Sequence, residues 1–183
     1  MKNINNRNVL YFDSQCPHAL NSFSESLRNL INSRKKKNQE LIFLCIGTDK
    51  VMGDCLGPIL GYRLKRNGCK ENIYGDLDFP VHAQNIKTVV KDIKKKHPRA
   101  FVIAIDASLG LKSHVGFITL GTGALYPGAG VGKELPKVGN VYITGIVNSS
   151  STQDFFDNTR LNIVMNLADT IYEGITKAEL ESL

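Results

Sequence analysis

Residues Leu41–Pro58 read LIFLCIGTDKVMGDCLGP, and this stretch decides the class of fold. Leu41–Ile46 is a short, continuous apolar run, which is typical of a strand buried on both faces of a sheet. Gly47 interrupts the run, a tight loop follows, and Asp54 stands just before the amphipathic segment Leu56–Arg66. The order of strand, loop, acidic residue and helix indicates an open parallel sheet, in which ligands bind at the carboxyl ends of the strands.

The rest of the chain alternates strand-like with helix-like segments. The patterns predict strands over Asn72–Asp76, Phe101–Ile105, Val115–Leu120 and Val141–Val147, and helices from Ser14 or Pro17 to Lys36, from Asp54 to Asn67, from Val81 to Lys96 and from Ser149–Thr152 to Lys177. Residues 1–13 are expected to form a loosely attached arm. The alternation predicts a three-layer α/β/α fold with a mostly parallel, twisted sheet covered on both faces.

Length and composition predict a single α/β domain over residues 1–183. Apolar residues make up 42% of the chain and charged residues 22%, as in ordinary globular proteins. A chain of 183 residues is long enough to bury a substantial core. No linker or repeat marks a boundary, so we expect an N-terminal arm and helix over residues 1–38 and the main core over residues 39–183.

The net charge of +6 is concentrated in clusters near the ends of the predicted helices. The clusters are Arg34–Lys37, Lys94–Lys96 and the group Arg63, Lys65 and Arg66. Cations suit the carboxyl end of a helix dipole, so solvated helix ends are the favoured interpretation and an acidic partner is the alternative. No aromatic residues interleave with the lysines, and a nucleic-acid surface is therefore not predicted.

The cysteines and the hydropathy indicate a reduced, cytoplasmic protein. The four cysteines form no CxxC pair, so zinc-ribbon and thioredoxin chemistry have no motif. Cys45 lies inside an apolar strand, whereas Cys55 follows Asp54 near a predicted helix start, where a thiol pKa can fall. We do not favour a role for Cys55 as a nucleophile. No apolar stretch reaches the roughly 18 residues of a membrane span, and the N-terminus lacks a signal-peptide core.

Two carboxylates at strand ends are the clearest chemistry in the sequence. Asp54 follows the first predicted strand, and Asp106 ends the predicted strand Phe101–Ile105. Either residue alone could cap a helix or accept bonds from loop amides. Together they could share a proton and position water, or bind a divalent metal with a third ligand. Asp76 ends another predicted strand at the same edge of the sheet. The sequence does not decide whether a metal binds near it.

A glycine-rich loop and one histidine complete the candidate site. The loop Gly121–Gly139 lacks both the GxxxxGK[ST] and the GxGxxG spacing, so nucleotide binding is not the favoured interpretation. The backbone at Gly128, Gly130 and Gly132 could approach a ligand or bind an oxyanion, or the glycines could only permit a compact loop. His82, in the segment FPVHAQN, could bind a metal, carry a proton or bond to the backbone at a helix start.

Three of these segments together resemble spore germination proteases and hydrogenase maturation endopeptidases. The segment IGTDKVMGDCLGP resembles the strand, glycine, loop and PDALGP pattern of the germination proteases, with Asp54 at its acidic position. The segment VIAIDAS resembles their second acidic motif, with Asp106 at its carboxylate, and YPGAGVG resembles their HPGSGVG segment. The three motifs occur in the family's order. The chain is similar in particular to the short YyaC-type sporulation proteins, which are regarded as spore proteases.

The resemblance implies a phosphorylase/hydrolase-like fold, with a protease-like core over residues 39–183 that hydrolyses peptide bonds. It also implies that Asp54 and Asp106 form the catalytic pair, and that the substrate is a protein or peptide, such as a small acid-soluble spore protein in the forespore. The metal-dependent relatives carry an acidic ligand where this chain has Cys55, and Tyr126 replaces the loop histidine of the germination proteases. We therefore expect no metal or other cofactor. A non-catalytic sporulation factor that binds a peptide in the same cleft and an amide hydrolase for a small molecule remain the alternatives.

Overall fold

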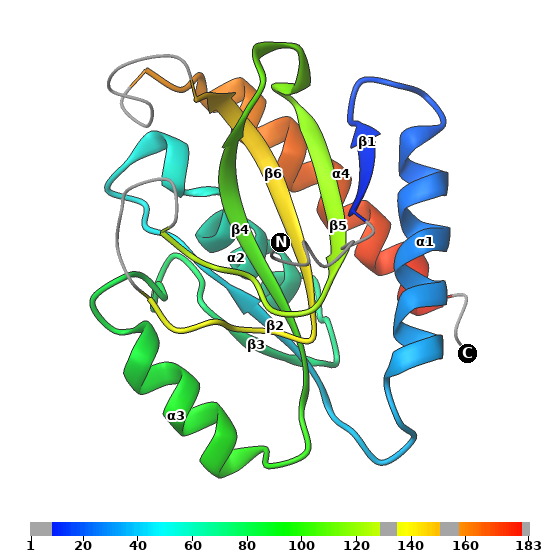
Figure 1. The fold of residues 1–183 in the computed structure, drawn as a ribbon, viewed down its shortest axis with the longest axis vertical. Coiled ribbons are helices and arrows are strands. Elements are labelled where there is room, and N and C mark those ends of the chain that lie inside the picture. The colour runs from blue at the N-terminus through cyan, green and yellow to red at the C-terminus, as the bar shows by residue number, and fades with distance from the viewer. Residues whose placement is uncertain (1–8, 129–134, 151–157, 181–183) are drawn as a thin grey trace, which may run out of the picture.

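The computed structural model describes residues 9–128, 135–150 and 158–180 (Figure 1). In chain order the elements are β1 (Val9–Asp13), α1 (Ala19–Arg34), β2 (Leu41–Cys45), the 3-10 turn η1 (Met52–Asp54), α2 (Leu56–Arg66), β3 (Asn72–Tyr74), α3 (Ile86–Lys96), β4 (Phe101–Gly110), the 3-10 turn η2 (Lys112–His114), β5 (Phe117–Thr122), β6 (Val141–Ser149) and α4 (Leu161–Leu180). No helix among the described residues is long and apolar enough to cross a membrane.

The strands form one mixed sheet in the order β1-β5-β6-β4-β2-β3. β3, β2, β4 and β6 run parallel, whereas β5 and β1 are antiparallel to their neighbours. The predicted mostly parallel α/β sheet is confirmed. β5 pairs with β6 on one side and with β1 on the other, so β1 forms the edge of the sheet.

Helices cover the two faces of the sheet unequally. α1, α2 and α4 pack on one face, where Leu27, Leu60 and Ile171 join a large core with the apolar side chains of the strands. α3 packs on the other face, where Ile86 and Ile93 meet a smaller core that also includes the segment after residue 134. The three-layer arrangement is confirmed. In Figure 1, however, no described helix lies in front of β5 and β6 on the α3 side.

The N-terminal segment is attached more firmly than the sequence indicated. Val9–Asp13 forms the edge strand β1 and pairs with β5 over five residues. Its Phe12 ring is only 9% exposed and meets Phe23 of α1 edge-to-face, with the ring centroids 5.5 Å apart. The expectation of a loose arm was therefore wrong for residues 9–13, because one buried aromatic ring and a ladder of backbone bonds fix this strand.

Two predicted helix starts were too early. α3 begins at Ile86 because residues 82–85 form a separate turn, and α4 begins at Leu161. The N-cap predicted over Ser149–Thr152 falls partly on β6, which includes Ser149, and partly on residues 151–157, which lie outside the described residues. Tertiary pairing with β4 extends β6 further than its apolar run suggested.

Helix α2 lies against the backbone at the ends of β2 and β3. A Cβ atom added at Gly57 would stand 2.0 Å from the carbonyl oxygen of Ile46, and one at Gly61 would stand 1.9 Å from that of Gly75. Both distances are far below van der Waals contact. The two glycines therefore set how closely α2 approaches the sheet, and with it the position of the loop that precedes the helix.

We predict that Gly57→Ala lowers the free energy of unfolding by about 1–3 kcal/mol, the usual effect of overpacking, even though alanine favours helix formation. The neighbouring atom is a backbone oxygen, which cannot move aside without moving the strand. Urea unfolding measures the change. Thr88→Ala, at an exposed position of α3, is the control and should change stability by less than about 0.5 kcal/mol. A Gly57→Ala protein as stable as the wild type would contradict the close packing.

Candidate functional site

The candidate site lies where β2 leaves β4. The two strands pair from Leu41↔Phe101 to Cys45↔Ile105. The amide of Ile46 then bonds to the carbonyl of Ile105 at 2.7 Å, and the chain turns away at Gly47 with a φ of 139°. β4 continues alone beside β6. The edge of β4 from residue 106 onward is thus open on the β2 side.

Asp106 is the first residue of β4 beyond this point. The prediction that Asp106 ends a strand was wrong, because β4 runs on to Gly110. The pairing of β4 with β2, however, does stop at Ile105, one residue before Asp106. Its side chain is 7% exposed and accepts a hydrogen bond from the amide of Ala107 at 2.9 Å. A carboxyl group is therefore held inside the sheet, where the Ala107 amide donates a hydrogen bond to it.

Asp54 is placed by a loop that closes on itself. The carbonyl of Asp54 accepts a bond from the amide of Thr48 at 3.0 Å, and its amide donates to Val51 at 2.9 Å. A Cβ at Gly47 would stand 2.0 Å from the same carbonyl oxygen, so only glycine allows this closure. The half-buried Asp54 thereby follows the end of β2 and directly precedes α2, and η1 contacts β4.

The two carboxyl groups influence each other electrostatically. Burial raises the pKa of Asp106 well above its ordinary value of 3.8, and the charge of Asp54 raises it further, while the Ala107 amide opposes both effects. A like charge has such an effect only over a short range. The structure thus places Asp54 near enough for its charge to act on Asp106, and it gives the two aspartates different environments, one half-buried and one buried.

Asp76 is neutralised by another residue. Burial alone would raise its pKa, but the Lys65 ammonium and the amide of Phe79 hold the pKa below the ordinary 3.8. Lys65 bonds directly to the Asp76 carboxylate, and the Phe79 amide donates to it at 2.6 Å. Asp76 is 3% exposed. It thus fixes the loop after β3 to helix α2.

No ligand cluster for a metal occurs in the described part of the chain. No group of three or more histidine, cysteine, aspartate and glutamate side chains there could hold an ion. Around Asp54 the neighbouring position is Cys55, whose thiol donates to the Met52 carbonyl at 2.9 Å. Burial raises the pKa of Cys55, and Asp54 and Asp49 add to the effect. A raised pKa is the opposite of what a thiolate nucleophile or ligand needs.

His82 lies at the same edge of the sheet and helps to form the turn before α3. Val81 makes a parallel bridge with Ile46, which places His82 beside the end of β2. Nδ1 of His82 accepts a bond from the amide of Gln84 at 3.3 Å, and the His82 amide donates to Asn85 at 2.8 Å. These contacts match the backbone-bonding role considered for it. Its role in binding substrate stays a prediction.

Only part of the predicted glycine loop can be placed. Gly128 has a φ of 71°, a left-handed conformation that favours glycine. Gly130 and Gly132 lie outside the described residues. Tyr126, which stands where germination proteases have a histidine, is 42% exposed and carries the Lys137 ammonium 4.7 Å from its ring centroid. The substrate-binding role of the three glycines stays a prediction.

Sequence reasoning missed a row of hydroxyl groups beside Asp106. Thr144 lies opposite Asp106 in the β4–β6 register, and its hydroxyl is 2.7 Å from that of Thr119 and 3.0 Å from that of Ser108. Thr119 and Thr144 are almost fully buried. The alternation of apolar and polar residues in β4 and β6 could have indicated this face, but the partners lie on three different strands.

A second missed cluster lies at the opposite edge of the sheet. Nδ1 of His97 is 2.6 Å from a carboxylate oxygen of Glu40, and its Nε2 is 3.0 Å from the Tyr74 hydroxyl. The pair could not be found from local patterns because Glu40 lies 57 residues from His97 in the sequence. Through its Tyr74 contact His97 links β3 to the end of α3.

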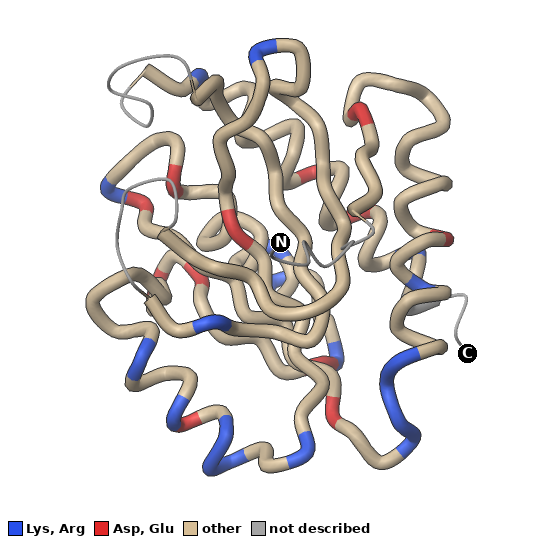
Figure 2. Tube along the Cα trace, viewed as in Figure 1, with Lys and Arg blue, Asp and Glu red and all other residues tan. Residues whose placement is uncertain are grey.

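Figure 2 shows that basic residues gather on α3 and on the turn between α1 and β2. Arg34 and Lys94–Lys96 lie in the last turns of their helices, as the sequence indicated. In α2 the Arg63 guanidinium pairs with Asp169 and Lys65 with Asp76. Helix-end solvation and local ion pairs therefore account for much of the clustered charge.

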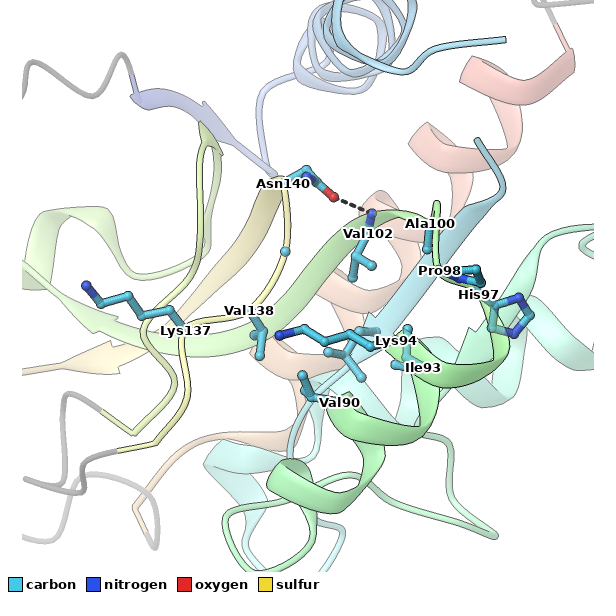
Figure 3. A pocket seen from close by; sticks show the side chains of 12 residues that line it. Val90, Ile93, Lys94, His97, Pro98, Ala100, Val102, Lys137, Val138 and Asn140 are labelled. Atoms are coloured by element: carbon cyan, nitrogen blue, oxygen red, sulfur yellow. Dashed lines mark hydrogen bonds between the residues drawn. The ribbon is translucent and has the colours of Figure 1, made fainter. Parts of the chain in front are cut away.

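A cavity of about 310 Å³ lies between α3 and the start of β4 (Figure 3). It is lined mainly by apolar side chains such as Val90, Val102 and Val138, with Lys94 at one side. Val102 precedes Asp106 by four residues, or roughly 13 Å along a strand. The cavity is thus separate from Asp106.

Comparison with known proteins places the chain in a family. A family model described as "Protein of unknown function (DUF1256)" matches residues 11–174. The chain belongs to this family. It is 43% identical over 164 residues to a protein of Bacillus subtilis (strain 168) described as "Uncharacterized protein YyaC", covering 87% of this chain and 80% of that protein. Among solved structures, the [NiFe] hydrogenase maturation protease HycI from Thermococcus kodakarensis KOD1 aligns with 82% of this chain and 99% of its own, at 14% identity and a TM-score of 0.45.

For this DUF1256 chain we predict that Asp106→Asn gains stability relative to the wild type as the pH rises. The folded-state pKa of Asp106 is raised, so the stability contributed by this carboxyl is complete below 3.8 and is lost as the pH rises through the raised pKa. Asparagine does not ionise and escapes this loss. Urea unfolding between about pH 4 and pH 9 measures the difference. Asp92→Asn, on the exposed surface of α3, should follow the wild-type profile, and parallel profiles for Asp106→Asn would contradict the prediction.

We predict that Lys65→Met destabilises the protein by about 1.5–3 kcal/mol at neutral pH, the usual value of a hydrogen bond to a charged group. The folded-state pKa of Asp76 is lowered, so its contribution is present above 3.8 and is lost as the pH falls through the lowered pKa. The difference between wild type and variant should therefore shrink in acid. Unfolding at neutral and acidic pH tests this, with Lys96→Met as the exposed control. A difference that is constant with pH would exclude the ion pair as its cause.

Proposed function

We propose that the protein is an aspartate-dependent peptidase that uses Asp54 and Asp106 as a pair. The observation that carries the proposal is the perturbed carboxyl group of Asp106, which is buried and has a pKa raised by burial and by the charge of Asp54. Two carboxyl groups whose environments separate their pKa values are suited to act as acid and base at the same pH. The order of the three sequence motifs that resemble germination proteases supports the same assignment.

In the proposed reaction Asp54 is the general base and the protonated Asp106 is the general acid. Asp54 accepts a proton from water, and the water oxygen bonds to the carbon of the scissile carbonyl. Asp106 gives its proton to the carbonyl oxygen, which produces a neutral diol. The proton on Asp54 then passes to the amide nitrogen as the C–N bond breaks, and Asp106 recovers a proton from a diol hydroxyl.

The proposed substrate is a protein or peptide segment. Three large apolar side chains are exposed in the loops that follow β2 and β3, namely Met52, Leu77 and Phe79, with Phe79 78% exposed. These loops stand at the same edge of the sheet as Asp54, where they could contact a polypeptide. By the resemblance, the substrate is a small acid-soluble spore protein, and the protein acts in the cytoplasm of the forespore during sporulation or germination. His82 and the backbone of Gly128, Gly130 and Gly132 are proposed to contact the substrate.

We predict that Asp54→Asn and Asp106→Asn each reduce cleavage of a small acid-soluble spore protein by at least about 100-fold, the lower range for loss of an acid–base group. Asp92→Asn, an exposed carboxylate on α3, and Cys55→Ala are the controls and should retain activity. The cleavage rate of the wild type should fall as the pH rises through the raised pKa of Asp106, because its acid form is the active one. Mass spectrometry of the products measures each rate.

Full activity of the Asp106→Asn protein would contradict the paired-carboxylate mechanism. Saturable binding of the spore protein without turnover by the wild type would instead favour the non-catalytic binding factor. Circular dichroism of each variant should match the wild type, so that loss of activity is not loss of folding.

A further inference from the structure

The cavity between α3 and the start of β4 has no part in the proposed reaction. Leu44 of β2, Ile93 of α3 and Val138 of the segment after residue 134 line it, and each of them is at most 4% exposed. The half-buried Val90 and Val102 add to the apolar lining. The volume of about 310 Å³ lies at the lower end of the range for small-molecule sites in proteins. A small ligand with an apolar body matches this space.

The backbone beside the cavity already has its hydrogen-bond partners. The amide of Val102 donates to the side-chain oxygen of Asn140 at 2.8 Å, as the dashed line in Figure 3 marks, and the carbonyl of Val102 accepts from the Asn140 amide at 2.7 Å. The amide of Ala100 donates to the carbonyl of His97 at 3.0 Å. Paired backbone groups offer little to a polar ligand. A polar contact to a ligand must therefore come from a side chain.

Two of the basic residues that line the cavity are already in contact with other side chains. Nδ1 of His97 lies 2.6 Å from the carboxylate of Glu40, and its Nε2 lies 3.0 Å from the Tyr74 hydroxyl. The ammonium of Lys137 lies 4.7 Å from the ring centroid of Tyr126, and Figure 3 shows the Lys137 side chain pointing away from the cavity. Neither side chain is well placed to bind a group inside the cavity.

Lys94 is the basic residue that faces the cavity. Figure 3 shows its side chain extending from α3 toward Val138, over the apolar lining. Among the described residues, no acidic side chain lines the cavity and no ion pair involves Lys94. The aliphatic stem of a lysine can cover apolar surface while its ammonium stays in water. The ammonium therefore places a positive charge at the edge of an apolar space.

We propose that this cavity binds a small amphipathic carboxylate, with its apolar tail between α3 and β4 and its carboxylate paired with Lys94. An apolar cavity of about 150 Å³ holds one molecule of benzene, so about 310 Å³ accepts a tail of roughly eight to twelve carbons. A single ammonium matches the single charge of a carboxylate better than the nearly double charge of a phosphate monoester. The site is separate from Asp106, and its assignment does not depend on the proposed peptidase.

The position of Lys94 over the cavity distinguishes it from the other lysines of the same helix end. Lys95 and Lys96 share the last turn of α3 with Lys94, but they do not line the cavity. The helix dipole favours a cation at all three positions alike. It does not explain an apolar space under one of them. Lys95 therefore provides a control with the same charge on the same turn.

The test measures the binding of four probes to the full chain by isothermal titration calorimetry. The probes are octanoate, octanol, octylammonium and acetate. We expect octanoate to bind more tightly than octanol, because the ammonium attracts its carboxylate, and octylammonium to bind more weakly than octanol. Acetate has no apolar tail and should show no measurable binding.

Lys94→Met keeps an apolar stem but removes the charge. This variant should weaken octanoate binding about five-fold, the upper value for an exposed ion pair, and leave octanol binding unchanged. Lys95→Met should bind every probe as the wild type does. Val102→Phe fills part of the cavity and should weaken octanoate and octanol alike, by about ten-fold if it displaces two methylene groups. Thermal unfolding checks each variant, and Lys94→Met alone decides the matter if Val102→Phe is unstable.

Three results would overturn the site. The first is a wild type that does not bind octanoate at millimolar concentration. The second is octanoate binding that Lys94→Met leaves unchanged, because the carboxylate would then be held elsewhere. The third is an equal loss with Lys95→Met, which would assign the effect to the general charge of the helix end. None of these measurements involves cleavage, so the failure of the site and the failure of the proposed peptidase are separate outcomes.

Discussion

The approach of helix α2 to the ends of β2 and β3 controls the geometry of the candidate site. Gly57 and Gly61 lie one helical turn apart and each meets a strand carbonyl that would clash with any side chain. The helix begins at Leu56, so a shift of its first turn would shift Asp54 by the same amount. A position set by backbone contact is more precise than one set by side-chain packing, because side chains can change rotamer and strand backbone atoms cannot. The site thus depends on an interaction in which no functional side chain takes part.

A second constraint comes from unequal strand lengths. β2 stops after Cys45, whereas β4 continues to Gly110 and, among the described strands, pairs there with β6 alone. Asp106 lies at the step between them, inside a strand and yet beside an opening. Burial in the strand raises the pKa of Asp106, and the charge of Asp54 raises it further. A carboxyl at a true strand end would be solvated and would keep a more ordinary pKa.

The sequence predicted the parts of this structure that local patterns determine. Leu41–Cys45 is a fully buried strand because each of its residues is apolar, and α2 ends next to Gly68 as its composition indicates. The strand Val9–Asp13 was missed because its stability comes from β5, more than a hundred residues away. The ion pair that occupies Asp76 was missed for a similar reason, since helix periodicity does not reveal that Lys65 points toward the loop after β3. Pairing across the fold is a tertiary property, and the hydroxyl row beside Asp106 is of the same kind.

The mixed topology gives the two halves of the sheet different surroundings. A parallel unit places Asp54 and Asp106 together because the loop after one strand meets the neighbouring strand. Parallel sheets are normally covered by helices on both faces, which would leave no room for an extended substrate. Here β5 and β1 run antiparallel, and a sheet of that kind can leave one face uncovered. The boundary between the two pairing modes lies at β6, whose Thr144 pairs with Asp106 on one side and with Thr119 on the other. The buried hydroxyl groups of Thr119 and Thr144 thus continue the face of Asp106 into the antiparallel half of the sheet.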